Sequence, residues 1–89
     1  MEELIAVAGK NILQLRSALH ITQQELASKA GVSVSYIRNI EHGKGNITLH
    51  IMKQISDVFG IYPFSLLLPD FRLPADWSDL LLLINLPKD

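Results

Sequence analysis

Hydrophobic residues recur along most of this 89-residue chain at spacings of three and four, which is the period of an amphipathic helix. The stripes predict helices over residues 3–19, 23–30, 34–42 and 49–59, followed by a short fifth helix over 63–68. The first stripe consists of Ile5, Ala8, Ile12, Leu15 and Leu19. The chain is therefore predicted to be all-α.

Capping residues mark the ends of the second and third predicted helices. Thr22, followed three residues later by Glu25, has the pattern of a capping box, in which each side chain accepts a hydrogen bond from the other residue's backbone N–H. Gly31 stands where the second helix must end, because the residue after a helix often needs a positive φ. Ser33 then provides a hydroxyl that can cap the third helix.

The other helix boundaries have similar signals. Thr48 is a cap for the fourth helix, which is predicted to end at Gly60. Pro63 suits the first position of the fifth helix, and Pro69 closes it. Gly9 interrupts the first stripe and predicts a bend or a separate N-terminal turn, since glycine costs a helix interior about 1 kcal/mol relative to alanine.

The most informative stretch is residues 22–41. Two short helices joined by a tight, glycine-containing turn are typical of a helix-turn-helix, whose second helix can enter the major groove of DNA. A helical hairpin that only supports a fold is the alternative. Ala27 is small where the second helix must cross closely. The apolar residues predicted to face inward are Leu26, Ala30, Val32, Ile37 and Ile40.

Five motifs follow one another in register along residues 22–60. They are Thr22-Gln23-x-Glu25-Leu26-Ala27, Ala30-Gly31-Val32-Ser33, Tyr36-Ile37, Ile40-Glu41-x-Gly43 and Leu49 through Gly60. Together they resemble the Cro/repressor-type (Xre-like) family of helix-turn-helix DNA-binding proteins. The resemblance covers about residues 10–67 and implies five helices of repressor type, with the helix over 34–42 as the recognition helix.

The resemblance places base-reading residues near the start of the recognition helix. It implies that Val34, Ser35 and Asn39 occupy base-reading positions, with Ser33 at the cap. Asparagine can pair with adenine, and valine can contact the methyl group of thymine. Arg38 can bind guanine or reach only phosphate.

Phosphate contacts are expected on either side of the recognition helix. Thr22 and Gln23 match backbone-contacting positions of the family and lie at a helix N-terminus, which favours anions. Tyr36, Lys44 and Asn46 are further candidates for phosphate contact, and Lys44 as ordinary surface is the alternative for that residue.

Arg16 and Glu41 form a predicted structural ion pair. The family often pairs these positions, and each residue lies at the edge of an apolar stripe. An arginine–carboxylate bridge would fix the first helix against the recognition helix.

The last part of the chain lies outside the resemblance. Residues 77–86 are apolar on almost every side if they are helical, and such a helix must be covered on every side. The chain is divided accordingly into a DNA-binding domain, 1–68, and a C-terminal linker and apolar segment, 69–89. The residues predicted to form a homodimer interface are Trp77, Leu80, Leu81, Leu83 and Ile84. Packing onto the chain's own core, docking to a different protein and a strand conformation are the alternatives.

Charge and composition agree with a DNA-binding centre. Residues 10–53 carry six lysine or arginine residues against two glutamates, whereas the whole chain has a net charge of −1. Ordinary scatter of surface charge is the alternative. The absence of cysteine and of a basic leader fits the cytoplasm, and no apolar run is long enough to span a membrane. The three histidines lack zinc-ligand spacing, so no enzyme activity, metal or cofactor is expected.

The function predicted from the sequence is a homodimeric transcriptional regulator. Two recognition helices about 34 Å apart would bind a palindromic operator of double-stranded DNA. The alternatives are an antitoxin, which binds both its operator and a toxin protein, and the controller protein of a restriction–modification system.

Overall fold

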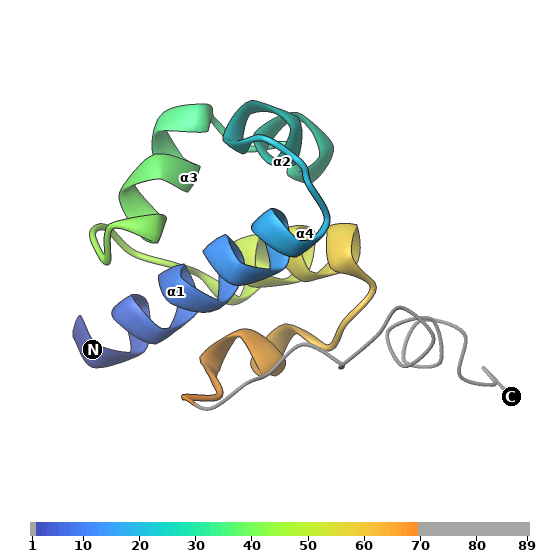
Figure 1. Cartoon of the computed structure of the whole chain (residues 1–89). Helices are drawn as coiled ribbons and strands as arrows, with labels where there is room; N and C mark the ends of the chain where they lie inside the picture. Colours follow the sequence, from blue (N-terminus) through green and yellow to red (C-terminus); the bar gives the residue numbers. More distant parts are fainter. Residues whose placement is uncertain (1, 70–89) are drawn as a thin grey trace, which may run out of the picture.

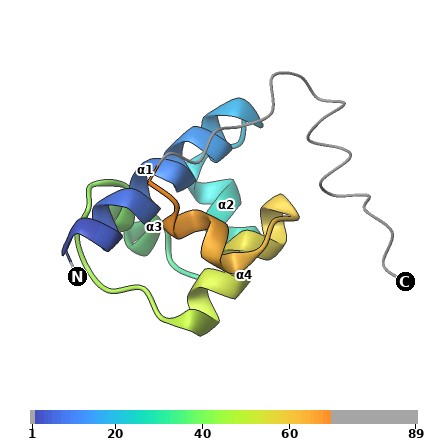
Figure 2. The same ribbon diagram turned by 90° about the horizontal axis from the view of Figure 1, so that it is seen from below.

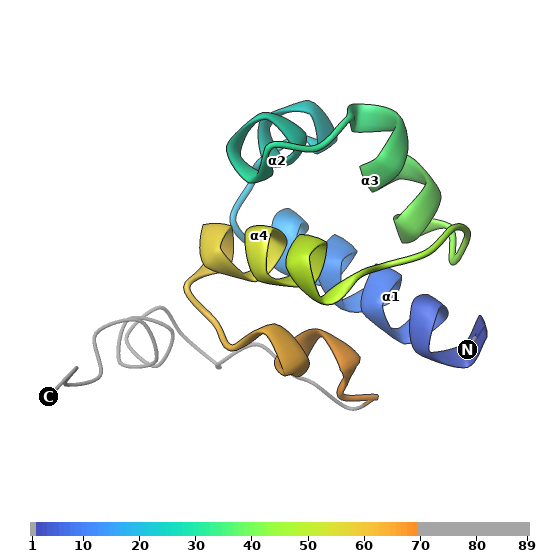
Figure 3. The same ribbon diagram turned by 180° about the vertical axis from the view of Figure 1, so that it is seen from behind.

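The computed structural model describes residues 2–69, and these residues form an all-helical domain without a β-strand. Figure 1 shows α2 and α3 on one side of α1, whereas η1, in orange, lies on the other side. From behind, the long connection from α3 to α4 is visible (Figure 3). The elements are α1 (Glu2–Ala18), α2 (Gln23–Ala30), α3 (Val34–Glu41), α4 (Leu49–Phe59) and the 3-10 helix η1 (Pro63–Leu67).

The predicted helix caps are confirmed. Thr22 and Glu25 form the capping box at the start of α2, and Gly31 ends that helix with a φ of 74°. The Ser33 hydroxyl accepts a hydrogen bond from the backbone of α3, and the Thr48 hydroxyl does the same for α4. These local bonds satisfy N–H groups that a helix start leaves without partners, so the ends of α2, α3 and α4 lie within one residue of their predicted positions.

The fifth predicted helix is wrong in type. Residues 63–67 form a 3-10 helix instead of an α-helix that continues to Leu68. Pro69 disfavours the helical conformation at the preceding residue, and Leu68 is extended, with φ −81° and ψ 116°. Only five residues lie between Tyr62 and the extended Leu68, which is too few for a regular series of α-helical hydrogen bonds. A bond that spans three residues, from the Ser65 N–H to the Tyr62 carbonyl, forms instead.

Gly9 neither bends nor interrupts the helix, because α1 is continuous from Glu2 to Ala18. The glycine instead allows α1 and α3 to approach each other closely. A Cβ atom at position 9 would lie 1.9 Å from the carbonyl oxygen of Ile40. Ala8 and Ile12, on either side of the contact in α1, are completely buried. The close crossing therefore fixes the position of α3 on the core.

The core lies between α1, α4 and the helix-turn-helix. The apolar residues predicted to face inward are buried, except for Val32, which is half-buried. η1 contributes the fully buried Leu66 and packs against α1 and α4, as the view from below shows (Figure 2). None of the helices within residues 2–69 combines the length and apolar character that crossing a membrane requires.

His20 is the one residue other than glycine with a positive φ, 58°, within residues 2–69. A left-handed conformation costs a residue other than glycine about 1–2 kcal/mol, and substitution by glycine relieves this strain. Glycine also has more conformational freedom in the unfolded chain, which offsets about 0.4–1 kcal/mol of that gain. We expect His20→Gly to raise the free energy of unfolding by about 0.5–1 kcal/mol, measured by urea denaturation. A lower stability would show that the imidazole makes a contact worth more than the strain, and His20→Asn serves as the second test.

Candidate nucleic-acid interface

The turn between α2 and α3 sets the direction of α3. The Val32 N–H donates to the Ala27 carbonyl at 3.0 Å, and Gly31 provides the left-handed conformation that reverses the chain. Ile37 and Ile40 on the inner face of α3 are almost completely buried. The buried side of α3 is thus fixed by the core, which leaves its opposite side for contact with another molecule.

The outer face of α3 presents the polar side chains predicted to read bases. Ser35, Arg38 and Asn39 are exposed, and their i, i+3 and i+4 spacing places them on one face. Ser33 is exposed and its hydroxyl accepts from the Tyr36 N–H at 3.0 Å. Val34 is half-buried and packs against the core. Three of the five residues therefore form a continuous polar surface, whereas Ser33 and Val34 also take part in the fold.

Tyr36 attaches the loop after α3 to that helix. Its hydroxyl donates to the carbonyl oxygen of Asn46 at 2.6 Å. Burial raises the pKa of this phenol above its usual range. Lys44 and Asn46 are exposed on the same loop. Three of the predicted phosphate ligands are thereby brought together, although the Tyr36 proton is already used within the protein.

Glu41 connects all three helices of the candidate interface. Arg16 of α1 donates from Nε to Glu41 Oε2 at 2.7 Å and from Nη2 to Oε1 at 3.0 Å. The hydrogen bond with Glu41 raises the pKa of Arg16, and Arg16 also donates to the Ile21 carbonyl at 3.0 Å. The Glu41 side chain is only 4% exposed, so this bidentate pair lies at the edge of the core.

Gln23 also belongs to this network, which the sequence did not reveal. Its amide nitrogen donates to Glu41 Oε1 at 2.8 Å. Gln23 is the first residue of α2, where the backbone N–H groups favour an anion. The same Glu41 carboxylate therefore orients Arg16 and a residue predicted to bind phosphate. Thr22, the other predicted residue here, is exposed and caps α2.

The helix-turn-helix profile matches residues 12–67, which include the whole capped α2–turn–α3 unit and the helices that support it. The chain belongs to the Cro/repressor-type helix-turn-helix family. Membership identifies the protein as a DNA-binding transcriptional regulator. This family of helix-turn-helix proteins is generally not enzymatic.

Two relatives illustrate how widely the helix-turn-helix family diverges. The uncharacterized HTH-type transcriptional regulator y4dJ of Sinorhizobium fredii is 26% identical over 68 residues, which cover 76% of this chain and 88% of that protein. Control protein C.BamHI of Bacillus amyloliquefaciens is 33% identical over 60 residues, which cover 66% of this chain and 74% of that protein. No solved structure matches the chain significantly.

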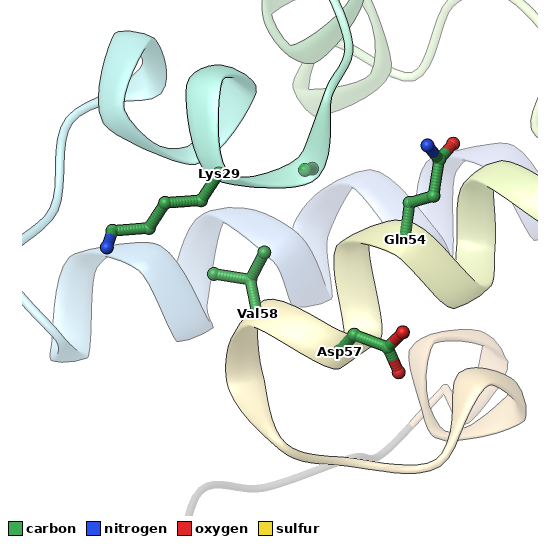
Figure 4. Close-up of a pocket in the computed structure, with 5 residues that line it drawn as sticks. Lys29, Gln54, Asp57 and Val58 are labelled. Atoms are coloured by element: carbon green, nitrogen blue, oxygen red, sulfur yellow. The ribbon is translucent and has the colours of Figure 1, made fainter.

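A depression beside the helix-turn-helix unit does not have the features of a ligand site. It lies between α2 and α4, has a volume of about 490 Å³ and is wide open to solvent. Figure 4 shows that Lys29 and Gln54 point in different directions instead of converging. Asp57, at its rim, accepts from Lys53 at 2.8 Å. Small-molecule sites are usually enclosed and have convergent polar groups, so this depression offers no candidate chemistry.

Asn11 is a second polar contact that the sequence analysis of this helix-turn-helix protein missed. Its side chain is buried, and its amide nitrogen donates to the carbonyl oxygens of Leu66 at 2.8 Å and Leu68 at 3.1 Å. The signal was its spacing, three residues after Ala8 and four before Leu15, which places it on the inner side of α1. Asn11 therefore fixes the end of η1 against α1, on the side of α1 opposite α3 (Figure 1).

Proposed function

We propose that the protein regulates transcription by binding a palindromic operator as a homodimer. α3 enters the major groove, where side chains of its outer face contact base edges and those around it contact phosphate. The base-reading set is Ser33, Val34, Ser35, Arg38 and Asn39. The phosphate-binding set is Thr22, Gln23, Tyr36, Lys44 and Asn46.

The observation that supports this proposal most directly is the exposed polar face of α3. Ser35, Arg38 and Asn39 lie on one side of a helix whose other side is held by buried isoleucines. Base recognition needs side chains at fixed positions relative to the groove, because a hydrogen bond weakens steeply with distance and angle. The short network around Glu41 provides such a fixed support.

The dimeric state is a separate part of the proposal. The predicted interface residues Trp77, Leu80, Leu81, Leu83 and Ile84 lie outside the described residues, so their support is the apolar sequence of the segment. We divide the chain into a DNA-binding domain, 1–68, and a dimerisation segment, 69–89. A single small DNA-binding domain binds DNA weakly, and two linked domains that bind half-sites one helical turn apart bind the whole operator much more tightly.

Among the alternatives, the controller protein has an observation in its favour. One of the relatives is named a control protein. A controller makes the same predictions for DNA binding as a repressor, whereas an antitoxin additionally requires a toxin partner.

Selection from a pool of random duplexes tests the proposed function. The full chain is expected to enrich an inverted repeat with half-site centres about 10 base pairs apart. Sedimentation of the complex is expected to give two chains per duplex. Enrichment of a lone half-site with one chain bound would contradict the homodimer, and recovery of unrelated sequences would contradict sequence-specific binding.

We expect Asn39→Ala to weaken operator binding and to relax the preference at one base pair. A bidentate contact with a base contributes about 1–3 kcal/mol of discrimination, so affinity should fall by about 10- to 100-fold. Binding to all four bases at each operator position, measured by competition, identifies the affected pair. Gln14→Ala, at an exposed position on α1, is the control. Equal losses on operator and unrelated DNA would show that Asn39 reads no base.

Lys44→Ala is expected to weaken binding to every duplex by a similar factor. Removal of one phosphate contact lowers the slope of log affinity against log salt by about 0.9, because fewer counterions are released. Titrations at several salt concentrations measure that slope, and Asn39→Ala should leave it unchanged. An unaltered slope for Lys44→Ala would assign this lysine to ordinary surface.

A further inference from the structure

An aromatic patch at η1 has no partner among residues 2–69. We define the patch as Tyr62, Phe64 and Leu68, which are 68%, 61% and 45% exposed. The two aromatic rings stack with their centroids 5.9 Å apart and an angle of 17° between their planes. The pair therefore presents a flat apolar surface.

The stretch of sequence that carries the aromatic patch has the composition of the centre of a protein interface. Residues 58–69 contain no charged side chain and no histidine. Interface centres are depleted in charge and enriched in aromatic residues. η1 packs on α1 and α4, on the side away from α2 and α3 (Figures 1 and 2). A partner on this patch would leave the outer face of α3 accessible to DNA.

The aromatic patch is built on a fixed backbone. Asn11 holds the carbonyl groups of Leu66 and Leu68, and the Leu66 side chain is completely buried. These contacts anchor the chain directly after Phe64, so a partner need not order this part of the backbone when it binds. Such preorganisation lowers the entropic cost of association.

We infer that the aromatic patch is the docking surface for residues 77–86 of a second copy of this chain, with the two copies exchanging these segments. The inference rests on the proposed homodimer and specifies its interface. Residues 77–86 contain one tryptophan, five leucines and one isoleucine against a single charged residue, Asp79.

Exchange between two copies explains how so apolar a segment is covered. One patch can cover one face of the segment, whereas the opposite face also has to leave water. In a symmetric pair, each segment packs on the partner's patch with one face and on the partner's segment with the other. The connection over residues 70–76 reaches up to about 25 Å, at about 3.5 Å per residue, which is enough to cross to a neighbouring domain.

Three full-length variants test the exchange by sedimentation equilibrium. Phe64→Asp alters the aromatic patch, Leu81→Asp alters the segment, and Leu13→Asp is the control. Leu13 is a 39% exposed leucine on α1 that points away from Asn11 and η1, because two residues turn a helix by about 200°. Thermal melting monitored by circular dichroism checks that each variant folds.

We expect the wild type and Leu13→Asp to dimerise, and the other two variants to dimerise at least about 10-fold more weakly. An equimolar mixture of Phe64→Asp and Leu81→Asp should recover part of the dimer, since the mixed pair has one contact between an intact segment and an intact patch, whereas each variant paired with itself has none. Restoration supports exchange between copies.

Each contrary outcome has a distinct meaning. A Phe64→Asp variant that dimerises like the wild type overturns the aromatic patch as the interface. Dissociation of both variants without any gain of dimer in the mixture overturns the exchange between copies. A monomeric wild type overturns the homodimer of the proposed function, which the random-duplex selection tests independently.

Discussion

Gly9→Ala is expected to destabilise the domain by about 3 kcal/mol, although alanine is the better helix former. The added methyl group would lie 1.9 Å from the Ile40 carbonyl oxygen, a backbone atom at the C-terminal end of α3. Relief of the clash requires α1 and α3 to move apart, which loosens the packing of Ile12 and Ile40. For a domain of this size, the loss corresponds to a melting temperature lower by about 15 °C.

The control for this substitution is Gln14→Ala, at an exposed position of the same helix. It adds no atom near α3 and should leave the melting temperature within a few degrees of the wild type. Operator affinity provides a second readout, because in the proposed complex a displaced α3 would meet the groove at a different angle. A Gly9→Ala variant as stable as the wild type would show that the close helix crossing is not required.

Glu41→Ala should have an effect of similar size, about 3 kcal/mol, because it removes the acceptor of three hydrogen bonds. Breaking a buried ion pair usually costs about 3–5 kcal/mol. The Arg16 side chain is 16% exposed and retains its bond to the Ile21 carbonyl, so we expect the lower end of this range. Urea denaturation measures the loss directly.

The double variant Arg16→Met with Glu41→Leu distinguishes the loss of the ion pair from the cost of leaving one buried charge without a partner. An apolar pair of similar volume leaves no unpaired charge, and such replacements are often neutral or stabilising. We therefore expect the double variant to recover most of the stability that Glu41→Ala removes. Its operator affinity should nevertheless be lower than that of the wild type, because Gln23 no longer has the carboxylate that orients it. A Glu41→Ala variant that melts like the wild type would refute the structural role of the pair.

The elements of the fold could be predicted because their ends depend on neighbouring residues. The Thr22–Glu25 capping box and Gly31 act within one helical turn, and both lie where the sequence placed them. The type of the fifth helix was less accessible, because a five-residue segment between two prolines has too few hydrogen bonds for a periodic pattern to reveal.

Contacts between distant residues explain what the sequence could not reveal. Gly9 is recognisable in the sequence as a poor helix former, but the structure requires glycine there because of the Ile40 carbonyl group, 31 residues later. Asn11 donates to carbonyl groups more than fifty residues away, and backbone acceptors leave no mark in the sequence. The Arg16–Glu41 pair was accessible only through resemblance to a family, since nothing local links these two residues. Base and phosphate contacts remain predictions that binding experiments must decide.

The separation of the two sides of α3 affects how this regulator can evolve. The inner side is held by Gly9, the buried isoleucines and the Glu41 network, whereas Ser35, Arg38 and Asn39 make no contribution to the core. If these three side chains read bases as we propose, mutations at their positions would change the recognised sequence with little loss of stability. Duplicated copies of the gene could therefore diverge toward different operators through a few substitutions, each passing through folded intermediates.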